Sequence, residues 1–181
     1  MGDKKPEELK EEGMTLFNQG QRDEALVIFQ QAAKAYSEVE DLLGQGEMLN
    51  NIGVIYRLDR NLGAAEEALN QANEIFSELG DEVRQAQVLG NLGDLSSRRK
   101  DYPGAEQYYS ESSALFASAG EYTMQADVLR MLSLMHIRKR NLWAAVDAMQ
   151  RSLKVRPKMS IPQRILFLLL VLATKMLSGG Q

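Results

Sequence analysis

Small residues return every forty positions along this chain of 181 residues. The series consists of Gly13, Gly53, Gly93 and Ser133. An alanine follows each of them by twelve positions, and a leucine precedes each by four. Four units of 40 residues account for 160 of the 181, so chance does not explain the pattern. A repeat of this length restricts the chain to stacked copies of one helical or β unit, because a single copy cannot bury its own apolar face.

Within each unit the apolar residues follow the period of an α-helix. In the second unit, Leu49, Ile52 and Tyr56 fall on one face of a predicted helix, and a second stripe begins at Ala65 after a short break. No stretch of the chain shows a credible strand pattern. Turn residues support the breaks: Gly80 and Gly120 read as helix ends, and Asn61, Asp101 and Asn141 read as N-caps. The predicted helix pairs are 6–19 with 22–40, 45–59 with 62–79, 82–99 with 102–119, and 122–139 with 142–155.

The recurring small residue has a structural explanation in a helix pair. Gly53 or Gly93 lets the second helix of its own unit come close, and the alanine twelve positions later serves the same contact from the other side. A large side chain at either place would separate two helices whose axes normally lie about 8–10 Å apart. Glu12 stands where the later units have an apolar residue, which suits a terminal unit whose outer side faces water.

These residues, with the segments LNNIGVIY (49–56) and LGNLGDLS (89–96), resemble the tetratricopeptide repeat family. The period of 40 rather than 34 is similar to the longer repeats of LGN, kinesin light chain and bacterial Rap regulators. The resemblance implies an all-α, right-handed α-solenoid of four helix hairpins plus a C-terminal hydrophobic helix. We expect the four units at about 6–40, 45–79, 82–119 and 122–156 within residues 1–156. An apolar helix and a flexible end are expected over 157–181.

Members of this family bind a peptide or helix of another protein in a concave groove lined by the first helices. The resemblance assigns ligand-backbone contacts to Asn51 and Asn91. The side chains predicted as further contacts are Asn50, Lys10, Gln87 and Arg130. An alternative is that the asparagines cap or bridge neighbouring helices. Relatives that grip chaperone C-termini use a carboxylate-binding cluster, and three of its five positions differ here, including Met14. The sequence therefore favours an adaptor that does not bind chaperone tails.

Composition argues against catalysis. The chain contains no cysteine, so a thiolate metal site is excluded. Its single histidine, His136, argues against a multi-histidine metal site and against a serine–histidine pair. Neither a glycine-rich phosphate loop nor a GxSxG or HExxH motif occurs. His136 falls on the predicted core face and is expected to be a packed side chain. We expect no enzyme activity, no cofactor and no metal.

Charge is distributed unevenly along the chain. Residues 1–90 carry eight basic and eighteen acidic side chains, a net of −10, whereas residues 91–181 carry thirteen and seven, a net of +6. Two basic triplets, 98–100 and 138–140, lie one period apart and raise the possibility of phosphate binding. Cations also suit the ends of helices, and few aromatic residues accompany these triplets. Nucleic acid is therefore an unlikely partner.

The tail departs from the repeat pattern. An unbroken apolar run spans 165–173, too short to cross a bilayer, which needs about 20 predominantly apolar residues. A helix that is apolar on all sides must be covered on all sides. The alternative function is therefore a membrane-surface tether or a self-association module acting through 154–177, with possible homo-oligomers or peripheral membrane contact. The charged N-terminal segment lacks the apolar core of a secretory signal, so a cytoplasmic location is expected.

Overall fold

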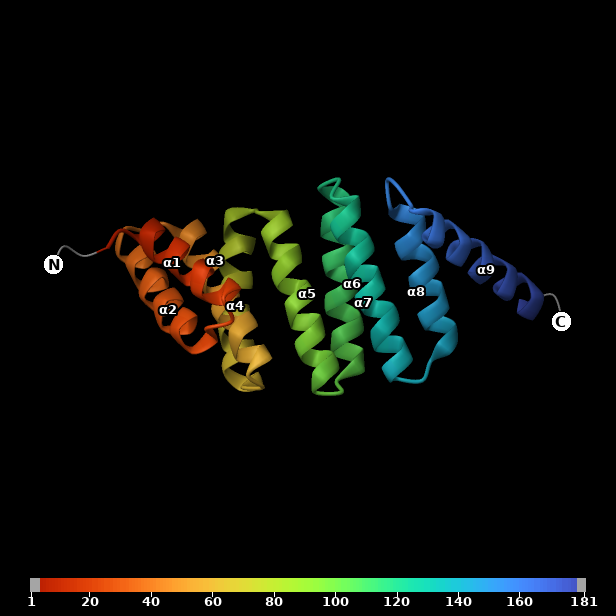
Figure 1. Cartoon of the computed structure of the whole chain (residues 1–181), viewed down its shortest axis with the longest axis horizontal. Coiled ribbons are helices and arrows are strands. Elements are labelled where there is room, and N and C mark those ends of the chain that lie inside the picture. The colour runs from red at the N-terminus through yellow and green to blue at the C-terminus, as the bar shows by residue number, and fades with distance from the viewer. Residues whose placement is uncertain (1–3, 179–181) are drawn as a thin grey trace. The chain divides into compact units, whose positions relative to one another are not determined.

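The computed structural model describes residues 4–178. The described part contains α-helices and no strands, so the predicted all-α class is confirmed. The helices are α1 (Pro6–Asn18), α2 (Arg22–Glu38), α3 (Leu42–Leu58), α4 (Leu62–Leu79), α5 (Glu82–Arg98), α6 (Tyr102–Ser118), α7 (Tyr122–Arg138), α8 (Leu142–Val155) and α9 (Ile161–Ser178) (Figure 1). The expected flexible end lies largely outside the described residues.

The chain forms two compact units, Met1–Leu95 and Ser96–Gln181. In the first unit α1 packs on α2, α2 on α3, and α3 on α4. In the second, α6 packs on α7, α7 on α8, and α9 makes a lighter contact with α8. Each unit is therefore a stack of consecutive helices, the arrangement of an α-solenoid.

Left-handed turn residues divide the chain into steps of twenty. A single residue with positive φ follows each helix from α1 to α7, close to its C-terminal end. The residues concerned are Gly20, Glu40, Arg60, Gly80, Lys100, Gly120 and Arg140. Gly80, with φ 66°, caps the end of α4 by donating its N–H to Phe76 and Ser77 carbonyls, as the sequence predicted. One helix and its turn thus occupy twenty residues, and two make the forty-residue period.

Polar N-caps begin several helices at the position after that turn residue. The side chain of Asn61 accepts a hydrogen bond from the backbone N–H of Ala64, which is three residues on. Asp101 and Asn141 do the same for α6 and α8, so all three predicted caps are confirmed. Asp41, which was not predicted as a cap, accepts from Gly44 N–H at 2.9 Å. Because of this cap α3 begins at Leu42, three residues before the expected start.

The recurring small residues lie where two helices of a hairpin approach most closely. A Cβ added to Gly53 would come within 2.6 Å of Leu69 Cγ and 3.3 Å of the Ala65 carbonyl oxygen. A Cβ on Gly13 would come within 2.6 Å of the Phe29 ring. The large apolar residue four positions after the repeat alanine therefore packs directly on the small residue.

In the fourth hairpin the recurring small residue is a serine, and a hydrogen bond joins it to the second helix. Ser133 Oγ donates to the backbone carbonyl of Ala145 at 2.7 Å, and both residues are buried. Ala145 is the repeat alanine of that unit. The predicted pairing of small residue and alanine is thus present in both compact units.

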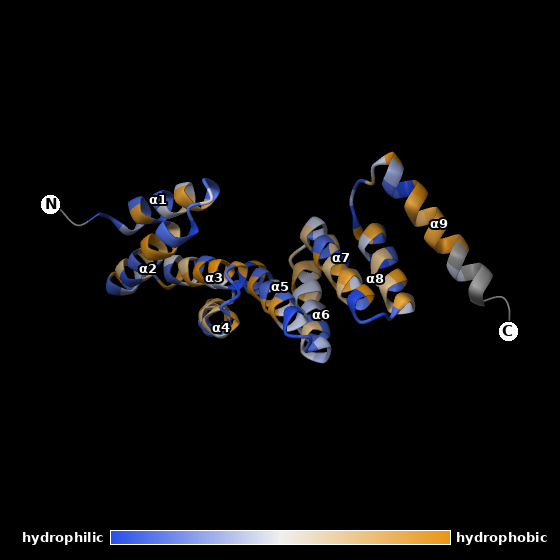
Figure 2. Cartoon of the chain, turned by 60° about the horizontal axis from the view of Figure 1, so that its bottom comes forward, coloured by the Kyte–Doolittle hydropathy of each residue, from blue (hydrophilic) through white to orange (hydrophobic). Residues whose placement is uncertain are grey.

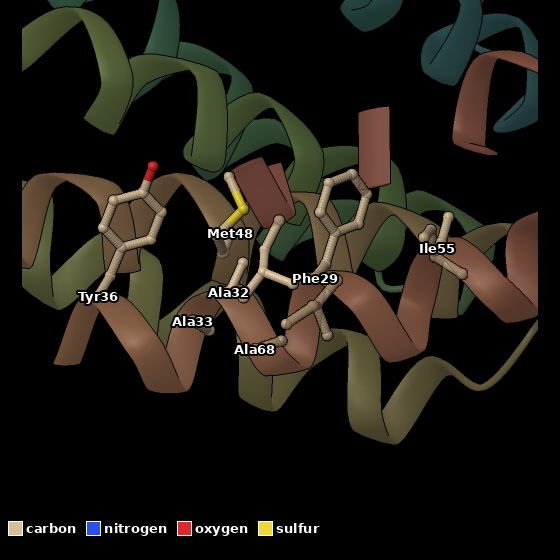
Figure 3. Close-up of a cluster of buried hydrophobic side chains, with 10 residues drawn as sticks. Phe29, Ala32, Ala33, Tyr36, Met48, Ile55 and Ala68 are labelled. Atoms are coloured by element: carbon tan, nitrogen blue, oxygen red, sulfur yellow. The ribbon is translucent and has the colours of Figure 1, made fainter. Parts of the chain in front are cut away.

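Apolar and hydrophilic residues alternate along most helices (Figure 2), and buried apolar residues form the core of the first unit, mainly between α2 and α3. Figure 3 shows Phe29 and Tyr36 from α2 beside Met48 and Ile55 from α3. Ala68 of α4 joins the same cluster. Because this cluster contains residues of two hairpins, stacking neighbours complete each other's core, as the repeat required.

The last helix is exposed along one side. Ile161, Leu168 and Leu169 expose 74%, 66% and 58% of their surface, respectively. Its other side meets α8, where Gln150 Nε2 donates to Thr174 Oγ1 at 3.3 Å. Among the described residues, no helix combines the length and apolar character needed to cross a membrane.

Candidate functional site

The polar face of α3 lies between α1 and α5 in the first unit. Positions 47, 50, 51, 54 and 57 have the spacing of one helical face. Side chains from three first helices meet here. We call this surface the first-helix face. It comprises Lys10 and Met14 of α1, Glu47, Asn50, Asn51, Val54 and Arg57 of α3, and Arg84, Gln87, Asn91 and Asp94 of α5.

Two of the predicted asparagines form a direct pair. Asn91 Nδ2 donates a hydrogen bond to Asn50 Oδ1 at 2.9 Å and so links α5 to α3. Both side chains are half-buried. An asparagine carries two donors and one acceptor group, so the pair uses only part of its capacity. Asn50 Nδ2 and Asn91 Oδ1 make no hydrogen bond with any residue between 4 and 178.

Asn51 lies one residue along, at the edge of a small pocket. Its Nδ2 contacts Met14 Sδ at 3.8 Å, a weak interaction since a thioether is a poor acceptor. The pocket encloses about 60 Å³ and is lined mainly by apolar side chains. They are Met14, Phe17, Phe29, Asn51 and Val54. Asn51 therefore presents a polar group at the rim of an apolar depression.

Alternating charged side chains cross the face from α1 to α5, and we call them the charge ladder. Its members are Lys10, Glu47, Arg84 and Asp81. Lys10 Nζ donates to one carboxylate oxygen of Glu47, and Arg84 donates to the other at 2.8 Å. Arg84 also pairs with Asp81 at 2.7 Å. Lys10, which was predicted as a ligand contact, is thus held by Glu47.

The ladder shifts the pKa values of its members. Burial alone raises the pKa of Glu47, but hydrogen bonds from Lys10 and Arg84 outweigh it, so the pKa of that carboxyl lies below its usual value. The pKa of Asp81 is lowered for the same reason, since bonds from Arg84 exceed the effect of burial. Hydrogen bonding to Asp81 and Glu47 raises the pKa of Arg84. All three groups are therefore charged at neutral pH.

We expect the ladder to add stability that acid removes. Since the folded pKa of Glu47 is depressed, its contribution is present above the unfolded pKa, about 4.3, and is lost as pH falls through the folded value. Glu47→Gln should lower the free energy of unfolding by about 1 kcal/mol at pH 7. In urea titrations the difference from wild type should shrink toward about pH 3.

The control for this prediction is Glu67→Gln, because Glu67 is exposed on α4. It should leave the unfolding free energy unchanged at both pH values. An equal deficit of the Glu47 variant at pH 7 and at acid pH would contradict the charge-based explanation.

A buried ion pair closes the far end of the face. Arg57 Nη1 donates to Asp94 Oδ2, and the two side chains are only 13% and 8% exposed. Ile55 and Leu95, close by in the sequence, are almost fully buried. This pair lies in the most enclosed polar environment on the face and ties α3 to α5.

The two remaining predicted contacts are placed differently. Gln87 lies on α5, exposed, one turn before Asn91. Arg130 lies on α7 in the second unit, exposed, with Nε 3.9 Å from Asp127 Oδ1. The structure therefore brings Lys10, Asn50, Asn51, Gln87 and Asn91 onto one face, whereas Arg130 belongs to the other unit.

Comparing equal positions of the repeat did not reveal the partners that hold this face together. Five contacts join residues that are 37 apart rather than 40. They are Lys10–Glu47, Met14–Asn51, Arg22–Asp59, Glu47–Arg84 and Arg57–Asp94. Four of the five join adjacent first helices, whereas Arg22 belongs to α2. The Asn50–Asn91 pair joins residues 41 apart, so adjacent first helices meet through positions three residues short of the period or one residue beyond it. A search for opposite charges at the period minus three would have found Glu47, Arg84, Arg57 and Asp94.

Within residues 4–178, the other candidate residues from the sequence do not come together in a catalytic or metal-binding site. His136 is 4% exposed, and its Nδ1 has no hydrogen-bond partner among the described residues. No group of three or more acidic or histidine side chains within the described range is placed to hold a metal ion. Arg138, from the second basic triplet, donates to Ser97 Oγ at 3.3 Å.

Comparisons with known proteins agree with this architecture. The crystal structure of BtubC (BKLC) from P. vanneervenii superimposes with a TM-score of 0.75 at 19% sequence identity, covering 88% of this chain and 71% of that one. At that identity the likeness shows the fold alone. A search of curated protein sequences finds no match. The tetratricopeptide repeat model matches residues 9–78 and 84–158. The chain therefore belongs to the tetratricopeptide repeat family.

Proposed function

We propose that this chain is an adaptor that binds an extended segment of a partner protein on the first-helix face. Tetratricopeptide repeats generally mediate protein–protein interaction and are generally non-catalytic scaffolds. The observation that carries the proposal is the Asn50–Asn91 pair, which leaves a donor and an acceptor unused on a half-buried surface. Half-buried polar groups with unused hydrogen-bonding capacity gain from a ligand that supplies partners.

A peptide backbone offers the complementary groups. Asn91 Oδ1 accepts a hydrogen bond from a ligand N–H, and Asn50 Nδ2 donates to a ligand carbonyl. Asn51 provides a further donor, because its contact to Met14 sulfur is weak and is exchanged at little cost for an amide oxygen. Three asparagines on two neighbouring helices thus read the backbone of the partner rather than its side chains.

The pocket beside Asn51 adds a side-chain preference. Its volume of about 60 Å³ and its lining of Met14, Phe17, Phe29 and Val54 suit one small apolar side chain. The partner therefore carries an aliphatic residue next to the backbone groups held by the asparagines. Residues 1–90 have a net charge of −10, which attracts partners with basic residues around that position.

The remaining predicted contacts take secondary roles. Gln87 lies one turn from Asn91 on α5 and serves as a side-chain contact at the edge of the face. Lys10 positions Glu47 and presents its remaining N–H groups to the ligand. Arg130 is a candidate side-chain contact of the second unit.

Affinity capture with the full chain tests this function. The double variant Asn51→Ala/Asn91→Ala should recover the partner at least about tenfold less than wild type, the loss expected when hydrogen bonds to a desolvated ligand backbone disappear. Stability should fall by only about 1 kcal/mol, because Asn50 loses one neutral hydrogen bond.

The matched control is Gln31→Ala/Asn70→Ala, which removes two exposed amide side chains from the second helices α2 and α4. This variant should capture the partner as well as wild type. If the Asn51/Asn91 variant retains full capture while it remains folded by circular dichroism, the first-helix face is not the binding surface.

A further inference from the structure

The outer side of α9 carries a continuous apolar stripe. Its members are Ile161, Ile165, Leu168, Leu169 and Leu172, each more than half exposed. With about 100° between successive residues, they fall within an arc of about 100° of the helix surface. An exposed apolar stripe on this scale marks a surface that meets something other than water. We call it the α9 stripe.

The stripe does not pack like the corresponding part of the repeat. One period earlier on α7, Val128, Leu129 and Leu132 are 9%, 2% and 4% exposed. Leu168, Leu169 and Leu172 occupy the same register positions but are 66%, 58% and 55% exposed. The helix thus directs toward solvent the positions that the repeat normally buries.

The opposite side of α9 faces the rest of its unit. Leu166, which is 42% exposed, and Leu170 line a cavity of about 360 Å³ together with Ile137 of α7 and Val146 and Met149 of α8. Thr174 accepts the hydrogen bond from Gln150 on that same side. With its inner side directed at α7 and α8, α9 presents the stripe as a free surface.

Positive charge is concentrated in the chain before α9 and in its first turn. Residues 148–181 contain six basic side chains and no acidic one. Arg151 pairs with Asp147, and Arg156 pairs with Asp127. Lys154, Lys158 and Arg164 form no ion pair with any side chain in the described range. A binding partner of this region therefore needs an apolar part that contacts the stripe and anionic groups that meet the cations.

We propose that α9 binds an anionic phospholipid surface, with the α9 stripe inserted at the level of the upper acyl chains and the three free cations at the headgroups. A bilayer of this kind supplies both required features, and a helix lying in its interface buries its apolar face about 5–10 Å deep. A second copy of α9 supplies the apolar surface but brings the same cations and no anions, so repulsion opposes that pairing. This inference is independent of the first-helix face.

Vesicle flotation with the full chain tests the proposal. Vesicles of phosphatidylcholine alone are compared with vesicles containing about one-third phosphatidylserine. The protein should float with the anionic vesicles, and at least about tenfold less should float with the neutral ones. Lys154→Gln/Lys158→Gln/Arg164→Gln should abolish this preference, and added salt should weaken the binding of wild type.

The apolar stripe is tested by Leu168→Glu/Leu172→Glu, which should lose flotation with both kinds of vesicle. Because both leucines are exposed, the variant should melt like wild type. Its matched control is Val27→Glu/Val39→Glu, since these valines are 51% and 62% exposed on the first unit. The control should float like wild type.

Either of two results overturns the proposal. The first is a failed flotation test, in which wild-type protein stays off anionic vesicles or the Leu168→Glu/Leu172→Glu variant floats with them as well as wild type does. The second is wild-type protein that sediments as a dimer, with the glutamates abolishing the dimer while flotation never occurs. The stripe would then be an interface between copies of this chain.

Discussion

Gly53→Leu should lower the free energy of unfolding by about 3 kcal/mol or more, the upper range for overpacking a close contact. A Cβ alone already approaches Leu69 Cγ at 2.6 Å and the Ala65 carbonyl oxygen at 3.3 Å. The leucine side chain can rotate, but the backbone of α4 can yield only if the two helices separate. The loss exceeds the gain of about 1 kcal/mol that leucine brings over glycine within a helix.

Gly63→Leu is the matched control for this result. Gly63 also lies in a helix of the second hairpin, but a Cβ there would meet nothing within 4 Å. Urea unfolding should show this variant unchanged or more stable by up to about 1 kcal/mol. An unchanged stability of Gly53→Leu in the same titration would mean that α3 and α4 do not cross closely there.

Asp94→Ala should destabilise the protein by about 3–5 kcal/mol, because it leaves Arg57 buried without its counter-charge. Both members of the pair are largely enclosed, at 13% and 8% exposure, so water cannot replace the lost carboxylate. The measurement is again the free energy of unfolding in urea.

A double replacement separates the ion pair from the packing around it. Arg57→Met/Asp94→Leu should recover most of the loss, since apolar residues of similar size often substitute for a buried ion pair without a large penalty. Asp59→Ala provides an exposed comparison: it breaks the Arg22–Asp59 pair, at 49% and 31% exposure, and should cost less than about 1 kcal/mol. If Asp94→Ala and Asp59→Ala cost the same, burial of the Arg57–Asp94 pair has no energetic consequence.

Much of the fold follows from local rules that a sequence displays directly. Asn61, Asp101 and Asn141 cap their helices because an Asn or Asp side chain before a helix accepts a hydrogen bond from the free backbone N–H three residues on. Gly53 contacts Leu69 because hairpin partners in every unit repeat the same spacing. Asp41 was not identified as a cap, because Gly44 and Gly46 follow it and glycine has a low helix propensity.

The candidate site was predictable only in part, because it depends on contacts between hairpins. The residues Asn50, Asn51 and Asn91 were identified, but their pairing depends on how adjacent first helices are offset. The contacts join residues 37 apart, as in Arg57–Asp94, or 41 apart, as in Asn50–Asn91, and not residues at equal positions of the repeat. The orientation of α9 is a further case, since a helix that is apolar on all sides does not specify which side turns outward.

The most direct test of the central claim, that a partner protein lies on the first-helix face, is site-specific photo-cross-linking. A benzophenone side chain in place of Met14, which lines the pocket beside Asn51, should cross-link to the captured partner. The same group in place of Val27, 51% exposed on α2, should not. Cross-links from position 27 with none from position 14 would contradict the account and move the binding surface to the second helices.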